Sequence, residues 1–141
     1  MTSTILQTAT RVLMPLLLLF AVFLLLRGHN QPGGGFVGGL VVASSFVLYS
    51  IAFGVDAGRR ALLVRPATLL GVGPLVALMS GLPAVITGQP FMTALWTEVP
   101  LGGTAVALGT PLVFDVGVCL AVIGVVLTIV FTLADVSLSE D

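Results

Sequence analysis

Charged side chains are scarce in this 141-residue chain, where they make up 8% of the residues, against roughly 25% in a soluble domain. Lysine is absent and all five cations are arginines, which excludes a phosphate-binding loop with its lysine. A single cysteine, Cys119, excludes an internal disulfide and a metal site built from several cysteines. The net charge of -1 gives no electrostatic argument for nucleic acid or for another anionic partner.

Hydrophobic residues, in contrast, make up 57% of the chain, and several apolar runs approach the roughly 20 residues that cross a bilayer as a helix. We therefore expect an all-α integral membrane protein that forms a single domain over residues 1–141, a small bundle of four transmembrane helices. The first run is interpreted as a retained span, because Arg27 follows it at once and no small-residue cleavage site appears. The expected spans cover residues 6–26, 36–55, 66–87 and 111–133.

A glycine-rich turn separates the first two spans, and it holds the only histidine, His29. Polar side chains and bare backbone are costly beside hydrocarbon, so we expect this turn to pack against protein or to line a hydrated cavity. The glycines that follow recur every four residues and form two rows of small residues along one helix. Such rows allow a second backbone to approach closely and predict tightly packed neighbours. The rows are Gly34 with Gly38, and Gly35 with Gly39 and Ala43.

The other connections differ in character. Residues 56–65 form a short polar connection with three arginines, and the third span contains Pro74 and Pro83, which predict a bent helix. In the long connection 88–109, Gly102-Gly103 lies between two stretches of strand-forming residues and indicates a β-hairpin; a short interfacial helix around residues 91–96 is the alternative. Thr110-Pro111 predicts the start of the last helix.

The arginines predict the orientation of the chain in the membrane. Four spans place Arg11 and the arginines of the 56–65 connection on one side of the membrane, and only Arg27 on the other. Positively charged residues favour the cytoplasmic side, so both termini are expected in the cytoplasm. The His29 turn and the connection that holds Trp96 would then face outward.

Two motifs resemble those of a known family. Residues 28–40 read GHNQPGGGFVGGL, and residues 110–118 read TPLVFDVGV. The first resembles the signature of the B subunit (MrpB/MnhB) of Mrp/Mnh-type multisubunit cation/proton antiporters, and the second is similar to that family's motif at the start of its last span. The length and the four-span plan are also similar, so the resemblance covers nearly the whole chain.

The resemblance implies a small accessory subunit that is needed for the activity of a hetero-oligomeric complex in the plasma membrane of a prokaryote. That complex exchanges cytoplasmic Na+ for external H+ and supports sodium and alkali tolerance. The partners expected are therefore the other antiporter subunits, the lipid bilayer, and Na+ and H+ as the ions that the complex transports. No cofactor and no metal site are expected.

Two side chains are candidates for the ion pathway. His29 could relay protons, since a histidine populates both forms near neutral pH; alternatively, it bonds nearby carbonyl groups of the glycine turn. Asp115 could bind a cation or carry a proton, because ionisable groups in spans are functional candidates; alternatively, it stabilises the N-terminus of its own helix. Both lie on the same expected side of the membrane, so they could meet.

The glycine turn itself has two interpretations. Pro32, Gly33 and the glycines up to Gly39 could present backbone carbonyls to a cation, but a compact turn with close helix packing explains the same residues. We favour the structural interpretation for Pro32, Gly33, Gly34, Gly35, Gly38 and Gly39. Cys119, one turn after Asp115, is expected to be a buried structural thiol.

Three other functions compete with an accessory antiporter subunit. A stand-alone four-span proton-coupled transporter would need an acidic residue deep in a span, whereas Asp115 is near the end of one. A purely structural scaffold subunit would contact no ion. A membrane enzyme is disfavoured, since the sequence shows no nucleophile paired with a base and only one cysteine.

Overall fold

The computed structural model describes residues 3–27 and 34–140, which form six helices and one β-hairpin. Four helices are long and apolar enough to cross a membrane, which confirms the expected fold class. The third of these candidate spans runs from Val55 to Ile86 and combines three consecutive helical segments. In chain order the elements are α1 (Thr4–Arg27), α2 (Gly35–Phe53), α3 (Val55–Leu62), α4 (Pro66–Met79), α5 (Leu82–Ile86), β1 (Trp96–Leu101), β2 (Thr104–Gly109) and α6 (Thr110–Ser139).

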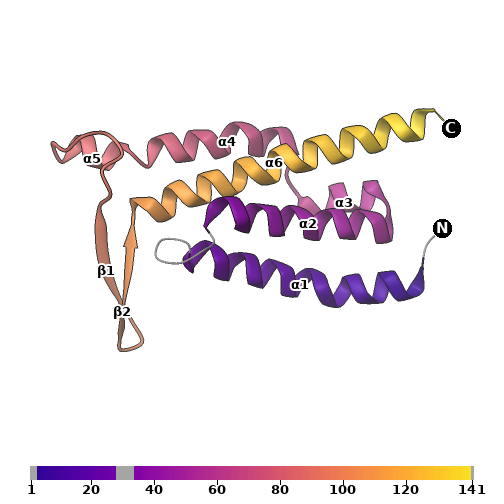
Figure 1. Ribbon diagram of the computed structural model, residues 1–141, viewed down its shortest axis with the longest axis horizontal. Coiled ribbons are helices and arrows are strands. Elements are labelled where there is room, and N and C mark those ends of the chain that lie inside the picture. Colours follow the sequence, from indigo (N-terminus) through magenta and orange to yellow (C-terminus); the bar gives the residue numbers. More distant parts are fainter. Residues whose placement is uncertain (1–2, 28–33, 141) are drawn as a thin grey trace.

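The long helices lie side by side in the order α1, α2, α6, α4, and we call this arrangement the helix row (Figure 1). The described ends of the chain lie at one end of the row, and the hairpin lies at the other. The four expected helices form an open row, in which α4 packs against α6 and does not return to α1. The physical reason is that lipid tails are as apolar as leucine, so the helices gain little by enclosing a common core.

The buried core is consequently small and lies where α2 meets α6. Its members are Ala43, Phe46, Cys119, Ile123, Leu127 and Phe131. Large apolar side chains elsewhere on the long helices are exposed, as expected for surfaces that face lipid or other membrane subunits.

Glycine contacts hold the row together. A Cβ on Gly38 would lie 3.2 Å from the carbonyl oxygen of Ala21 in α1, and a Cβ on Gly39 would lie 2.9 Å from the carbonyl oxygen of Cys119 in α6. Gly38 and Gly39, one from each predicted glycine row, therefore face two different helices. Each position lets the backbones approach to a distance that a side chain would prevent.

The contact between α4 and α6 uses glycines that the sequence analysis did not single out. A Cβ on Gly117 would lie 2.5 Å from the backbone nitrogen of Ala77 and 2.7 Å from the carbonyl oxygen of Gly73. A Cβ on Gly124 would lie 2.7 Å from the backbone nitrogen of Leu70. The available signal was the four-residue spacing of small residues in both helices, at Gly73 and Ala77 and at Gly117 and Ala121.

The polar connection expected over residues 56–65 is in large part a helix, α3. Asp56 lies in its first turn and two arginines lie in its last turn. These charges complement the helix dipole and stabilise a short helix. The chain then passes Leu63 in a left-handed conformation, with φ of 65°, before α4 begins.

Within residues 66–87, the third span expected from the sequence, the helix is interrupted, as its prolines predict, but at one place only. Pro74 lies inside α4, which continues to Met79, and the break falls at Ser80 and Gly81, before Pro83 in the first turn of α5. The Ser80 hydroxyl donates a hydrogen bond to the carbonyl oxygen of Ala77, at 2.6 Å. The side chain thus bonds a carbonyl group near the helix end.

The hairpin expected around Gly102-Gly103 is present. Antiparallel pairing runs from Trp96 with Gly109 to Leu101 with Thr104, which leaves the two glycines as the turn. Both have positive φ, 56° and 83°, as a two-residue hairpin turn requires. The hairpin projects across the end of the helix row (Figure 1). Residues 91–96 are not helical, so the alternative of an interfacial helix there is wrong.

The last helix begins at Thr110 and has Gly109 as its N-cap, so Thr110 is the first helical residue and does not cap it. Its hydroxyl instead accepts a hydrogen bond from the Leu95 backbone N–H, at 3.1 Å. At 30 residues, α6 is roughly 45 Å long and exceeds a hydrocarbon core of roughly 30 Å. The helix is therefore long enough to cross the hydrocarbon core at a tilt.

Candidate functional site

Asp115 lies just inside α6, and its carboxylate lies beside the start of a different helix. The first turn of α6 contains no acidic residue, so Asp115 lies beyond the turn in which a helix dipole acts most strongly. A Cβ on Gly34, the N-cap of α2, would lie 3.7 Å from Asp115 Oδ2 and 3.8 Å from Oδ1. The positive end of the α2 dipole, rather than that of α6, is therefore available to the carboxylate.

The close approach depends on two glycines. A Cβ on Gly35 would collide with the carbonyl oxygen of Asp115 and would lie 3.0 Å from its Cα. Gly34 has φ of 100°, a conformation that costs a residue with a side chain much more than glycine. Its N–H donates a hydrogen bond to the carbonyl oxygen of Leu24, at 3.0 Å. The end of α1, the start of α2 and the start of α6 thus meet at Asp115.

His29, Pro32 and Gly33 lie outside the described residues, so a contact between His29 and Asp115 stays a prediction. The described part of the glycine run is helical from Gly35 onward, and the carbonyl of Gly34 already accepts the Gly38 N–H at 2.9 Å. Carbonyl groups occupied by helix hydrogen bonds do not present the open oxygens of an ion filter. From Gly34 onward, the structure therefore supports the interpretation of these glycines as positions of close helix packing.

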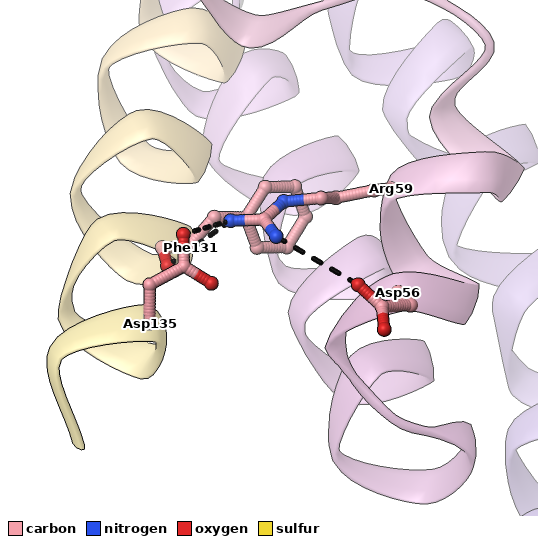
Figure 2. Close-up of polar contacts among 4 residues, drawn as sticks. All are labelled: Asp56, Arg59, Phe131 and Asp135. Carbon is pink, nitrogen blue, oxygen red and sulfur yellow. Dashed lines mark hydrogen bonds and ion pairs between the residues drawn. The ribbon is translucent and has the colours of Figure 1, made fainter. Parts of the chain in front are cut away.

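A second polar cluster lies toward the opposite end of the helix row, and Figure 2 shows its four residues. Arg59 of α3 lies across α6: its guanidinium donates hydrogen bonds to Asp135 Oδ2, at 2.5 Å, and to the carbonyl oxygen of Phe131, at 3.3 Å. The guanidinium carbon also lies 5.3 Å from the centre of the Phe131 ring. Asp56, one turn earlier in α3, is 3.8 Å away.

This cluster fastens α3 to α6, and the sequence analysis missed it. The available signals were Asp56 and Arg59 one turn apart, and Phe131 and Asp135 one turn apart at the end of the last span. A planar guanidinium suits this arrangement, because it can bond a carboxylate and stack on an aromatic ring together. The Arg59 guanidinium is bound by other residues of the same chain, which indicates a structural role for the cluster.

We expect Arg59→Gln to destabilise the docking of α3 by about 1–2 kcal/mol, since it removes a partly exposed ion pair and a cation–π contact. Limited proteolysis within residues 54–65, on the complex in mild detergent, measures this. The matched control is Arg11→Gln, which also removes one cation–π contact, with the Phe53 ring, but lies in α1. Equal cleavage of the two variants and the unmodified chain would contradict the assigned role.

The remaining candidates are structural in the part of the chain described. Cys119 is buried within the contact between α2 and α6, as expected. Across residues 3–27 and 34–140, no group of three or more histidine, cysteine, aspartate or glutamate side chains is arranged to hold a metal ion. Asp115 is thus the candidate site residue that the structure places where several helices meet.

Comparison with known proteins decides the family. Residues 5–128 match a family described as a domain related to the MnhB subunit of Na+/H+ antiporter. The chain belongs to the MnhB family. This match confirms the resemblance that the motifs at residues 28–40 and 110–118 indicate. Together with the four helices that are long and apolar enough to cross a membrane, it supports a multi-pass membrane protein.

Individual relatives of this MnhB-family chain agree. The chain is 41% identical to the B subunit of the Na(+)/H(+) antiporter of Bacillus subtilis (strain 168), over 93% of its length and 92% of the relative. It is 37% identical to the protein of the same name from Alkalihalophilus pseudofirmus, over the same shares. Among solved structures, a chain of the Mrp complex from Dietzia sp. DQ12-45-1b is similar, with a TM-score of 0.73 and 34% identity. The match covers 87% of this chain but 13% of that longer one.

Proposed function

We propose that this chain is an accessory membrane subunit of a multisubunit Na+/H+ antiporter, is needed for assembly of the complex, and borders an ion pathway at Asp115. The observation that carries the proposal is the similarity to antiporter B subunits over 93% of the chain. The open helix row supports it, since exposed apolar faces on both sides of a single row suit contact with neighbouring membrane subunits.

Asp115 supports the finer part of the proposal, a role at an ion pathway. A carboxylate within a membrane-spanning helix is costly and is kept where it contacts ions, protons or a polar partner. Here it is half-buried and lies at the junction of α1, α2 and α6. In this proposal it takes up a cation or a proton directly. His29, on the same expected side of the membrane, is the second candidate.

The chain acts in this proposal without covalent chemistry, in the plasma membrane of a prokaryote. Both termini are assigned to the cytoplasm, because Arg11 is level with Phe53 at the end of α2, the same end at which the three arginines of residues 59–65 lie. Four of the five arginines are therefore gathered at the end that carries the chain termini, as the cytoplasmic preference of arginine favours.

Affinity purification tests the assignment to a complex. The tagged chain, extracted from its native membrane in mild detergent, should bring down several different membrane proteins, among them the two large antiporter-like subunits. Deleting the chain should abolish Na+/H+ exchange in membrane vesicles, and its re-expression should restore it. Purification of the chain alone, with exchange activity in liposomes, would support the stand-alone transporter instead.

A further inference from the structure

Beyond the exchange activity, the end of the row that carries the chain termini holds an unassigned groove. It has a volume of about 540 Å³ and lies between the α3–α4 connection and the last third of α6. Three of the five arginines of the chain, Arg59, Arg60 and Arg65, are among its lining residues. The groove is therefore the most basic place on the described part of the chain.

The arginines of the groove divide into two kinds. Arg59 is held by Asp135 and Phe131, and its charge is balanced within the chain. Arg60 and Arg65 are exposed, and neither Asp56 nor Asp135 lines the groove with them. Arg60 and Arg65 thus line a groove whose remaining lining residues, apart from Arg59, are apolar or hydroxyl-bearing. This arrangement favours a ligand with a phosphate.

The depth of the groove relative to the membrane identifies the source of that phosphate. Pro66 begins α4, and Thr132 lies near the end of the expected last span, so the groove is at the level of the lipid headgroups. Its apolar lining includes Val64 and Ala67 and continues into the exposed apolar surfaces of α4 and α6. The positive end of the α4 dipole also begins at Pro66. A charged opening above a hydrophobic wall matches a phospholipid rather than a soluble anion.

Leu63 at the rim of the groove adds a further observation. It is 91% exposed and has φ of 65°, which is unfavourable for a bulky residue. With Leu63 in this backbone conformation, the connection between α3 and α4 lines the groove with Leu63, Val64 and Arg65. An exposed leucine next to two arginines is typical of a surface that meets both the acyl chains and the headgroup of a lipid.

We propose that this groove binds an anionic phospholipid of the leaflet on the side of the chain termini. Arg60 and Arg65 bind the headgroup phosphate, and the acyl chains lie against the wall formed by α4 and α6. Basic pockets between membrane-spanning helices on the cytoplasmic side are suited to anionic headgroups. The bound lipid would fill the space between α3 and the start of α4.

Photo-cross-linking tests this proposal at a single position. Leu63 is replaced by a photo-reactive phenylalanine analogue in the complete complex, which is irradiated in its native membrane and purified, and the product attached to this chain is identified by mass spectrometry. We expect a phosphatidylglycerol or cardiolipin adduct, enriched over phosphatidylethanolamine relative to the membrane composition. An adduct with a peptide of another subunit, or adducts that only reflect lipid abundance, would overturn the proposal.

Charge variants provide the control. Arg60→Gln and Arg65→Gln should each lower the anionic-lipid adduct by roughly fivefold, the factor that corresponds to about 1 kcal/mol per arginine near an anionic surface. Arg11→Gln removes one positive charge on the same side of the membrane but outside the groove, and it should leave the adduct unchanged. Ala67→Trp, which narrows the groove without changing its charge, should also lower the adduct. Equal yields from all four variants would refute the site.

Discussion

Replacing Asp115 by asparagine will lower Na+/H+ exchange at least about tenfold, equivalent to about 1.4 kcal/mol, while the complex still assembles. Asparagine keeps the size and the hydrogen-bonding oxygen of the side chain but can neither carry a negative charge nor take up a proton. The close contact between Gly35 and the Asp115 backbone is unaffected by the change. Exchange in everted membrane vesicles, normalised to the amount of complex, measures the effect.

Glu98→Gln is the matched control for this prediction. Glu98 lies in β1 and is exposed, on the same expected side of the membrane as Asp115. The control substitution therefore removes one carboxylate from that side without affecting the junction of α1, α2 and α6, and exchange should stay unchanged. If Asp115→Asn exchanged normally, Asp115 would be structural and the scaffold interpretation would hold. His29→Ala, measured in the same way, tests the second candidate separately.

Gly73→Leu will prevent α4 from docking on α6, at an expected cost of about 3 kcal/mol or more, the upper part of the range for overpacked contacts. A Cβ at Gly73 would collide with the backbone nitrogen of Ala121 and lie 2.7 Å from the carbonyl oxygen of Gly117. Backbone atoms cannot move aside as a flexible side chain can. The measurement is the melting temperature and the monodisperse fraction of the tagged chain in mild detergent.

Gly71→Leu controls for the helix propensity and the added volume, because the two glycines lie in the same helix. Beyond its chain neighbours and the adjacent backbone of its own helix, no atom lies within 4 Å of a Cβ placed on Gly71, and the residue is exposed. In water, replacing a helical glycine by leucine favours the helix by up to about 1 kcal/mol, so this variant should be as stable as the unmodified chain or more so. Similar losses in the two variants would show that α4 and α6 are not joined as described.

The sequence predicted those features of the fold for which a local pattern of residues has a single physical consequence. Apolar length predicts a span because a helix needs about 20 residues to cross a typical hydrocarbon core. The number of expected spans, four, agrees with the four candidate spans of the structure. Gly102-Gly103 predicted the hairpin because few other residues adopt two successive positive φ values. The rows with Gly38 and Gly39 predicted close helix packing, although not which helix each row would face.

The candidate site was only partly predictable. Asp115 stood out because a carboxylate is rare within a span, but its relation to Gly34 depends on how α2 and α6 come together, over a separation of some eighty residues in the chain. The Arg59 cluster was missed for the same reason. The cluster consists of two pairs of residues one turn apart, one in α3 and one in α6, and such pairs are common in helices. The pairs form a cluster only because α3 lies against α6 in the folded chain.

By itself, the sequence determined that this chain is a four-span membrane protein, which bends at its third span, carries a hairpin at one end, and resembles the antiporter B subunits. Those properties follow from local composition, since each depends on residues close together in the chain. Only tertiary packing decided the order of the helices in an open row, the contact of Asp115 with α2 and the basic groove. In a membrane that packing depends on which backbones can approach most closely, and hydropathy does not encode which glycine meets which carbonyl.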